Sequence, residues 1–415
     1  MSAATGIAGS AGRQYALVNA AYWSFTLTDG ALRMLVLLHF FALGYTPFQL
    51  ALMFWLYEAA GIVANLFGGW AATHYGVTRT LAAGIGLQVA GLLMLSALDP
   101  AWSPGLSVVW VVVSQGVSGV AKDLTKTSAK SAIRLVATDQ SATLFRWVAW
   151  FTGSKNAMKG VGFFVGGLML ANFGFRGTLW ILAAALVLVL AGVLVSLPRL
   201  RGGGKASKIR ELFAKSSGVN RIAAARVFLF GARDVWFVVG VPVFLYANGW
   251  HFIQVAGFLA AWTIGYGLVQ AIAPKLVSRS ADGLSREIPA AKVWAAAMAA
   301  VPFLIMGALQ LHLGLSPDVV LIGGLALFGV AFAVNSSLHS YLILAYAGSK
   351  KAAEDVGFYY AANAAGRLAG TLLSGLLYQA GGLFACLAGS GVMLLACLGV
   401  CLALPGRAPH LSLAR

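Results

Sequence analysis

The stretch PRLRGGGKASKIRELFAKSSGVNR, residues 198–221, decides how this chain is organised. It is the longest polar connection in a sequence of 415 residues that is 60% hydrophobic and only 10% charged. Soluble domains are far less apolar than this. Six long apolar segments precede the stretch and six follow it, so it predicts a basic linker, 198–220, between two six-helix halves, 1–197 and 221–415.

Each apolar segment is long enough for an α-helix to cross a hydrocarbon core of about 30 Å, which takes about 20 residues. The sequence therefore predicts an all-α membrane protein embedded in a lipid bilayer. The first segment is too long for the core of a signal peptide, so we expect it to remain as the first membrane helix. The twelve predicted spans are 15–42, 47–71, 78–98, 106–136, 143–170, 175–197, 221–246, 251–273, 290–310, 317–345, 354–380 and 382–404.

The formal net charge of +17 is distributed unevenly along the chain. Most of the 29 Lys and Arg residues lie near the two termini and in alternate connections between spans, whereas the opposite connections contain only Arg176. This asymmetry is the positive-inside pattern of membrane proteins. It predicts that both termini are cytoplasmic, and it explains most of the excess charge without a nucleic-acid partner.

The two halves resemble each other in sequence. An offset of 205 residues aligns span 7 with span 1, and an offset of 208 aligns span 11 with span 5. Parallel six-helix repeats are typical of major facilitator transporters, whose binding site lies near the bilayer midplane between the halves. The matched pairs are Asp29 with Asp234, Gly44 with Gly249, Gln49 with Gln254, Lys159 with Arg367, Gly162 with Gly370, Gly167 with Gly375, and Gly174 with Gly382.

Charged residues within the predicted spans are unbalanced. A charge at the centre of a membrane helix costs about 2.5 to 3.5 kcal/mol on the insertion scale, so it normally faces a water-filled cavity or a partner. Nine basic residues cannot all pair with four acidic ones, and the surplus predicts a small anionic cargo. The basic residues are Arg33, Lys122, Lys126, Lys130, Lys155, Lys159, Arg226, Arg233 and Arg367, and the acidic ones are Asp29, Glu58, Asp123 and Asp234.

The basic residues on spans 4 and 5 recur every four residues. Lys122, Lys126 and Lys130 therefore share one side of a helix, and Lys155 and Lys159 repeat the spacing on the next span. We expect these ammonium groups to line one wall of a substrate-binding cavity. Ammonium groups bind phosphate-like oxygens as point charges, whereas guanidinium groups can bind them through two parallel hydrogen bonds. The predicted guanidinium ligands are Arg33, Arg233 and Arg367.

Some of these residues have alternative roles. Lys130 lies near the cytoplasmic end of its span and can extend to the surface, and the adjacent Arg233 and Asp234 can form a structural ion pair. The carboxylates of Asp29, Glu58 and Asp234 can exchange protons during transport or can hold neighbouring basic side chains in place. Asp123 is expected to pair with a neighbouring lysine.

The remaining chemistry-bearing residues predict neither a metal site nor a catalytic one. Cys386, Cys397 and Cys401 all lie in the last span, where we interpret them as packing residues. The six histidines show no metal-ligand spacing, and His339, with Asn335, is at most an auxiliary donor to the cavity. We therefore expect a protein that is not an enzyme and that has no cofactor.

Three stretches carry a family resemblance: NAAYWSFTLTDGALRMLVLLHF (19–40), GVAKDLTKTSAKSAI (119–133) and GSKNAMKGVGFFVGG (153–167). They resemble the ArsJ family, the organoarsenical efflux permeases of the major facilitator superfamily. ARVFLFGARDVWFVVGVPVFL (225–245) is similar to the same family's span 7. The resemblance thus covers most of the chain and is most specific in the first half.

The resemblance implies an arsenate-resistance protein of the bacterial inner membrane. Its functional partner would be a glyceraldehyde-3-phosphate dehydrogenase that accepts arsenate in place of phosphate. The cargo would be the product, 1-arseno-3-phosphoglycerate, exported by a monomeric permease through proton antiport. The residues themselves predict only a small polyanion, so two alternatives stay open. One is an antiporter that takes up an organophosphate in exchange for phosphate, and the other is a receptor that binds a phosphorylated metabolite without transporting it.

Overall fold

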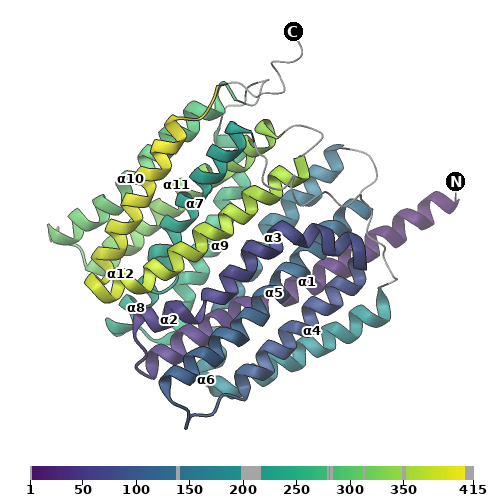
Figure 1. The fold of residues 1–415 in the computed structure, drawn as a ribbon, viewed down its shortest axis with the longest axis horizontal. Coiled ribbons are helices and arrows are strands. Elements are labelled where there is room, and N and C mark those ends of the chain that lie inside the picture. Colours follow the sequence, from purple (N-terminus) through teal and green to yellow (C-terminus); the bar gives the residue numbers. More distant parts are fainter. Residues whose placement is uncertain are drawn as a thin grey trace. The chain divides into compact units, whose positions relative to one another are not determined.

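The computed structural model describes residues 2–136, 141–197, 216–277, 280, 284–311, 314–347 and 352–406. These residues form α-helices and contain no β-strand, which confirms the predicted all-α class for the described part of the chain (Figure 1). Residues 198–215 of the predicted linker lie outside the described residues. The helices are α1 (Ser2–Ala42), α2 (Pro47–Met53), α3 (Trp55–Tyr75), α4 (Val77–Ser96), α5 (Pro104–Val136), α6 (Ser141–Ser196), α7 (Ser217–Phe237), α8 (Gly240–Ala247), α9 (Phe252–Leu276), α10 (Glu287–Gln310), α11 (Pro317–Tyr346) and α12 (Ala352–Leu402).

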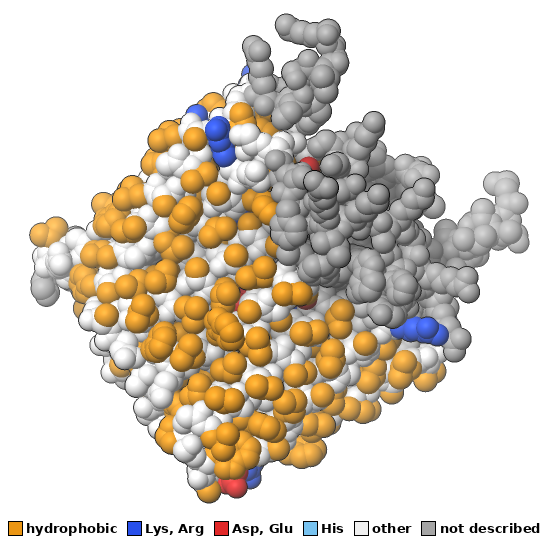
Figure 2. Space-filling view, viewed as in Figure 1, with side chains coloured by type: hydrophobic (Ala, Val, Ile, Leu, Met, Phe, Trp, Pro, Cys, Tyr) orange, Lys and Arg blue, Asp and Glu red, His pale blue; other side chains and the backbone are white. Residues whose placement is uncertain are grey.

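The described helices have the length and surface of a multi-pass membrane protein. Ten helical stretches are long and apolar enough to cross a membrane. Large apolar side chains such as Leu188, Val195 and Leu311 are at least 71% exposed. Figure 2 shows hydrophobic side chains over much of the described surface. Such a surface is unfavourable in water but suits the hydrocarbon core of a bilayer.

Two of the ten stretches are about twice as long as one crossing requires. Ser154–Ser196 has 43 residues and Asp355–Leu402 has 48. The helical backbone of α6 is interrupted at Gly174 (φ 65°, ψ −175°), and that of α12 at Gly382 (φ 61°, ψ −152°). Positive φ values favour glycine, which has no Cβ. The two glycines are one of the pairs matched at the offset of 208, so the same interruption occurs at equivalent places in the two halves.

The connections that follow α1 and α8 also share a local structure. Gly44 has φ 87° and its counterpart Gly249 has φ 90°. Gln49 lies five residues after Gly44, and its side-chain carbonyl accepts a hydrogen bond of 2.9 Å from the backbone N–H of Thr46. Gln254 lies five residues after Gly249, and its side-chain carbonyl accepts the equivalent bond of 2.8 Å from the backbone N–H of His251. The offset of 205 therefore pairs residues that have the same conformation and the same contacts.

The described chain divides into two compact units that differ from the two sequence halves. Each half contributes one segment to the unit formed mainly by the other half. Unit 1 contains Met1–His39, Val63–Ala206 and His251–Thr263, and unit 2 contains Phe40–Ile62, Ser207–Trp250 and Ile264–Arg415.

Glycine contacts show that the exchanged segments pack in equivalent ways within their units. In unit 1, a Cβ added at Gly167 of α6 would meet Ala256 and the carbonyl of Phe252, both in α9. In unit 2, a Cβ added at Gly375 of α12 would meet Ala51 of α2. Gly375 follows Gly167 by 208 residues, and Ala256 follows Ala51 by 205. The internal repeat therefore extends from sequence to helix packing.

Candidate functional site: two clusters of buried charge

A close crossing of α1 and α6 positions the charged residues of these two helices in unit 1. A Cβ added at Gly162 would meet the backbone of Leu27, and one added at Gly30 would lie 2.7 Å from the backbone carbonyl of Lys159. Small residues allow membrane helices to approach this closely. The crossing therefore places the backbone of Lys159 against Gly30, the residue that follows Asp29.

The predicted lysine series on α5 is held by one carboxylate and one amide. Lys126 Nζ donates to Asn65 Oδ1 over 2.7 Å and to Asp123 Oδ1 over 3.2 Å. Lys122 Nζ lies 3.8 Å from Asp123 Oδ2. Asp123 thus pairs with neighbouring lysines, as the sequence predicts, whereas Asn65 of α3 was not singled out because an amide in a membrane helix is a weak signal.

Unit 1 has an excess of positive charge within its described spans. Lys155 and Lys159 are partly buried, and Asp29 and Arg33 are both buried. Lys159 Nζ also lies 5.6 Å from the ring centroid of Phe163, within range of a cation–π interaction. Of the side chains predicted to lie in the membrane, five basic ones and two acidic ones are described in this unit. The side chain of Lys130 lies outside the described residues.

Unit 2 instead contains a chain of ion pairs with alternating charge. Arg367 Nη2 lies 2.6 Å from Glu58 Oε1, and Arg367 Nε lies 3.3 Å from Asp234 Oδ2. Arg233 Nε donates to Asp234 Oδ1 over 2.6 Å. Each carboxylate side chain is only 1% exposed. We call Glu58, Arg367, Asp234 and Arg233 the unit 2 ion-pair network.

The internal repeat explains why the two clusters differ in charge. Asp29 and Lys159 of unit 1 are the counterparts of Asp234 and Arg367 in unit 2. The offset of 205 places Thr263 at the position equivalent to Glu58. A hydroxyl group therefore occupies the position in unit 1 that is equivalent to the Glu58 carboxylate of unit 2.

The predicted arginine ligands Arg233 and Arg367 are therefore bonded to carboxylates in this structure. A buried ion pair is costly to break from one side, because the remaining charge is left without compensation. An anionic substrate would have to share these guanidinium groups with Glu58 and Asp234. The prediction that they bind substrate remains a prediction.

Arg226 of α7 is held mainly by neutral groups. Its Nη1 donates to the backbone carbonyl of Ser336 over 3.0 Å and to the Ser336 hydroxyl over 3.1 Å. Its Nε donates to Asn363 Oδ1 over 3.0 Å. The guanidinium carbon lies 4.0 Å from the ring centroid of Phe230 and 4.9 Å from that of Tyr359. These contacts indicate a structural role in joining α7, α11 and α12.

The structure also brings a histidine together with two cysteines that the sequence predicts only as packing residues. His339 of α11 lies beside Cys397 and Cys401 of α12, and all three side chains are buried. The sequence offered no signal for this cluster, because His339 precedes Cys401 by 62 residues and the three residues follow no known metal-ligand spacing. The cluster contains none of the residues predicted to bind substrate.

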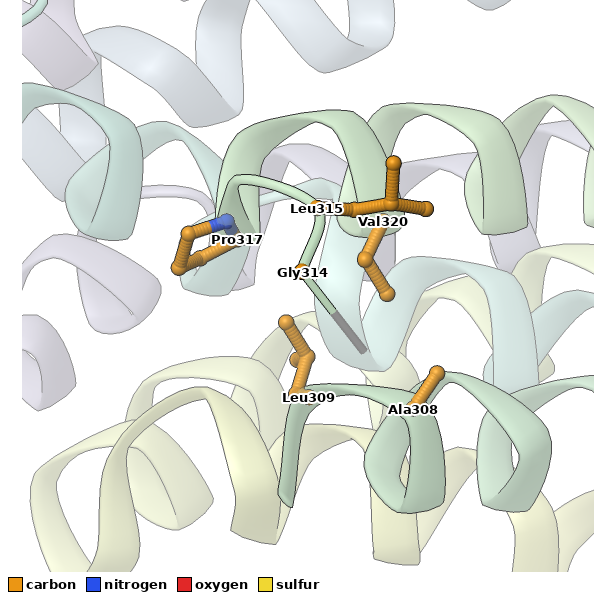
Figure 3. Close-up of a pocket in the computed structure, with 6 residues that line it drawn as sticks. All are labelled: Ala308, Leu309, Gly314, Leu315, Pro317 and Val320. Atoms are coloured by element: carbon orange, nitrogen blue, oxygen red, sulfur yellow. The ribbon is translucent and has the colours of Figure 1, made fainter. Parts of the chain in front are cut away.

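An apolar hollow of about 190 Å³ lies where α10 is followed by α11 (Figure 3). It contains none of the charged residues discussed above. None of its described lining residues carries a charge that would complement an anion. Its lining residues are Ala308, Leu309, Gly314, Leu315, Pro317 and Val320.

Comparisons of the chain with protein-family models and with curated proteins found no match.

Proposed function

We propose that this protein is a secondary transporter of the major facilitator type, with twelve membrane spans in two six-helix halves. The ten membrane-length stretches support this architecture, because the two long ones can each be divided at a matched glycine into two spans. The repeated turns and helix contacts support two halves of common structure. The transporter operates by alternating access in the bacterial inner membrane.

The cargo that best fits the charged residues is a small organic anion with more than one charged group. The observation that carries this proposal is the excess of basic side chains among those described within the predicted spans of unit 1, where five basic groups accompany Asp29 and Asp123. A dianion or trianion would compensate this excess in a medium where charges are poorly solvated. Its ligands are the ammonium groups of Lys122, Lys126, Lys155 and Lys159, together with Arg33 and Lys130.

The resemblance to the ArsJ family selects one cargo from this class, 1-arseno-3-phosphoglycerate. This molecule carries an acyl arsenate at one end and a phosphate ester at the other, so two anionic groups can contact lysines on two different helices. Export of the molecule would confer arsenate resistance when a glyceraldehyde-3-phosphate dehydrogenase supplies it. The same lysines would also suit an organophosphate taken up in exchange for phosphate, and the direction of transport distinguishes the two functions.

The unit 2 ion-pair network is the candidate for proton coupling. Glu58 and Asp234 are both buried and both bonded to Arg367. Protonation of Glu58 would remove the charge that holds Arg367 on one side, and loss of the proton would restore it. Such an exchange can link proton movement to the conformational change of a transporter.

A binding experiment tests the polyanion site without depending on the coupling ion. Thermal stabilisation of the purified protein should increase with the charge of the added compound, from glycerol to 3-phosphoglycerate to 2,3-bisphosphoglycerate, a stable substitute for the labile cargo. Lys159→Gln should raise at least tenfold the concentration of the bisphosphate that gives half of the maximal stabilisation. Equal responses to glycerol and to the bisphosphate would contradict the proposal.

A further inference from the structure

The buried cluster of His339, Cys397 and Cys401 lies entirely within unit 2. Cys397 and Cys401 are four residues apart on α12, so they project from the same face of the helix toward His339 on α11. One ligand atom from each residue lies within 4.8 Å of the other two. A histidine and two cysteines at this separation form three quarters of a common zinc ligand set.

The distance between the ligand atoms of His339 and Cys401 fits a shared ion. His339 Nε2 and Cys401 Sγ are 3.6 Å apart. Zinc–sulfur bonds of about 2.3 Å and zinc–nitrogen bonds of about 2.0 to 2.1 Å, joined at a tetrahedral angle, place the two ligand atoms about 3.6 Å apart. The separation of these two ligand atoms therefore matches that of two ligands on one tetrahedral ion.

The charge of the ligands favours a divalent cation. Two thiolates and one neutral imidazole carry a total charge of −2, which a divalent ion neutralises completely. A neutral complex is the form that a buried site in a membrane helix tolerates best, because a net charge there has no water to solvate it. A monovalent ion such as Cu⁺ would leave one negative charge in the cluster.

Neighbouring polar groups provide a second, independent observation. Asn335 precedes His339 by four residues on α11 and is fully buried. Within the described part of the chain, neither atom of its side-chain amide has a hydrogen-bond partner, and the same is true of His339 Nδ1. Buried polar atoms are normally bonded, so those without a partner indicate a ligand or water. Zinc with three protein ligands takes a fourth, which a water molecule or an amide oxygen can supply.

We propose that His339, Cys397 and Cys401 bind one Zn²⁺ ion that links α11 to α12. The two thiols lose their protons to solvent when the ion binds, and the imidazole binds in its neutral form. Cys401 is one residue before the end of α12, so the ion can enter from that end of the helix. This site is independent of the proposed transport function, and its role is to stabilise the helix pair.

The metal content of the intact protein tests the proposal directly. Tag-free protein should be purified from cells grown with added zinc and analysed by inductively coupled plasma mass spectrometry. We expect about one zinc per chain, which should fall at least fivefold in Cys401→Ser and in His339→Gln. Cys386→Ser is the matched control, because this buried thiol of α12 contacts the carbonyl of Ser374 and lies outside the cluster.

Addition of Cd²⁺ to protein stripped of metal gives a second readout that does not depend on any variant. Thiolate ligands should produce a charge-transfer absorption band that saturates at one equivalent. Wild-type protein that contains no zinc and develops no such band would overturn the proposal. Zinc retained in full by a folded Cys397→Ser/Cys401→Ser variant would overturn it as well.

Discussion

Arg367 and Glu58 are separated by 309 residues in sequence, yet Arg367 Nη2 lies 2.6 Å from Glu58 Oε1. The contact joins α12 to α3 within unit 2, and Asp234 of α7 binds the same guanidinium group. Three helices are therefore connected through one arginine. In a low-dielectric interior, removal of one partner from such an ion pair destabilises the fold, because the other charge is left buried without compensation.

The first prediction concerns this ion pair. Glu58→Gln should destabilise the protein, because Arg367 loses one of its two carboxylates. Arg367→Gln should do the same by leaving Glu58 without its guanidinium group. The double variant should lose less stability than the sum of the two single losses, with a coupling free energy of about 1 to 3 kcal/mol. Thermal unfolding in detergent measures the stability of the three variants. Strictly additive losses would show that there is no coupling free energy between Glu58 and Arg367.

The second prediction concerns the lysines of unit 1. Lys122→Gln and Lys159→Gln should each abolish most transport while the protein still inserts into the membrane, because a neutral amide cannot compensate an anionic cargo. Arg407→Gln is the control on the C-terminal tail and should change transport little. Export should be compared at equal amounts of protein in the membrane. Normal export by both lysine variants would exclude these residues from the binding site.

The third prediction concerns the crossing of α1 and α6. A methyl group at Gly162 would collide with the backbone of Leu27, which cannot move aside as a side chain can. Gly162→Ala should therefore destabilise the protein by about 1 to 3 kcal/mol. At Gly192, in the part of α6 that follows the interruption at Gly174, an added Cβ would meet nothing within 4 Å. Gly192→Ala should be neutral or slightly stabilising, because alanine favours a helix over glycine by about 1 kcal/mol.

The fourth prediction separates Arg226 from the substrate ligands. Arg226→Gln removes the bonds to Ser336 and Asn363, so the yield and thermal stability of folded protein should fall. The protein that does fold should transport with an unchanged KM, because the arginine contacts helices and not cargo. A large increase in KM with normal stability would instead assign Arg226 to the binding site.

Features that depend on local spacing could be predicted from the sequence. Lys122 and Lys126 are one helical turn apart, so their shared position beside Asp123 followed from the spacing alone. The matched glycines at 174 and 382 were also visible in the sequence, and their common backbone conformation agrees with the repeat. Both kinds of signal are periodic or local, and they do not require knowledge of which helices are neighbours.

Contacts between distant segments could not be predicted in the same way. Nothing in the spacing of Glu58 and Arg367 indicates that α3 meets α12, and nothing links His339 to Cys401. The balance of charge also depends on packing, since the sequence predicts that Arg367 binds the cargo, whereas in the structure it is paired with Glu58 and Asp234. Sequence patterns define the faces of single helices, whereas helix packing decides which faces meet.

The most direct test of the account is accumulation of labelled arsenate in everted membrane vesicles that contain the protein. The vesicles should be supplied with glyceraldehyde-3-phosphate dehydrogenase, glyceraldehyde 3-phosphate and NAD, with each omitted in turn. We predict that accumulation requires the complete enzyme system, is lost in Lys159→Gln, and collapses when a protonophore is added. Vesicles that are active by an independent transport assay but accumulate no arsenic with the complete system would contradict the account.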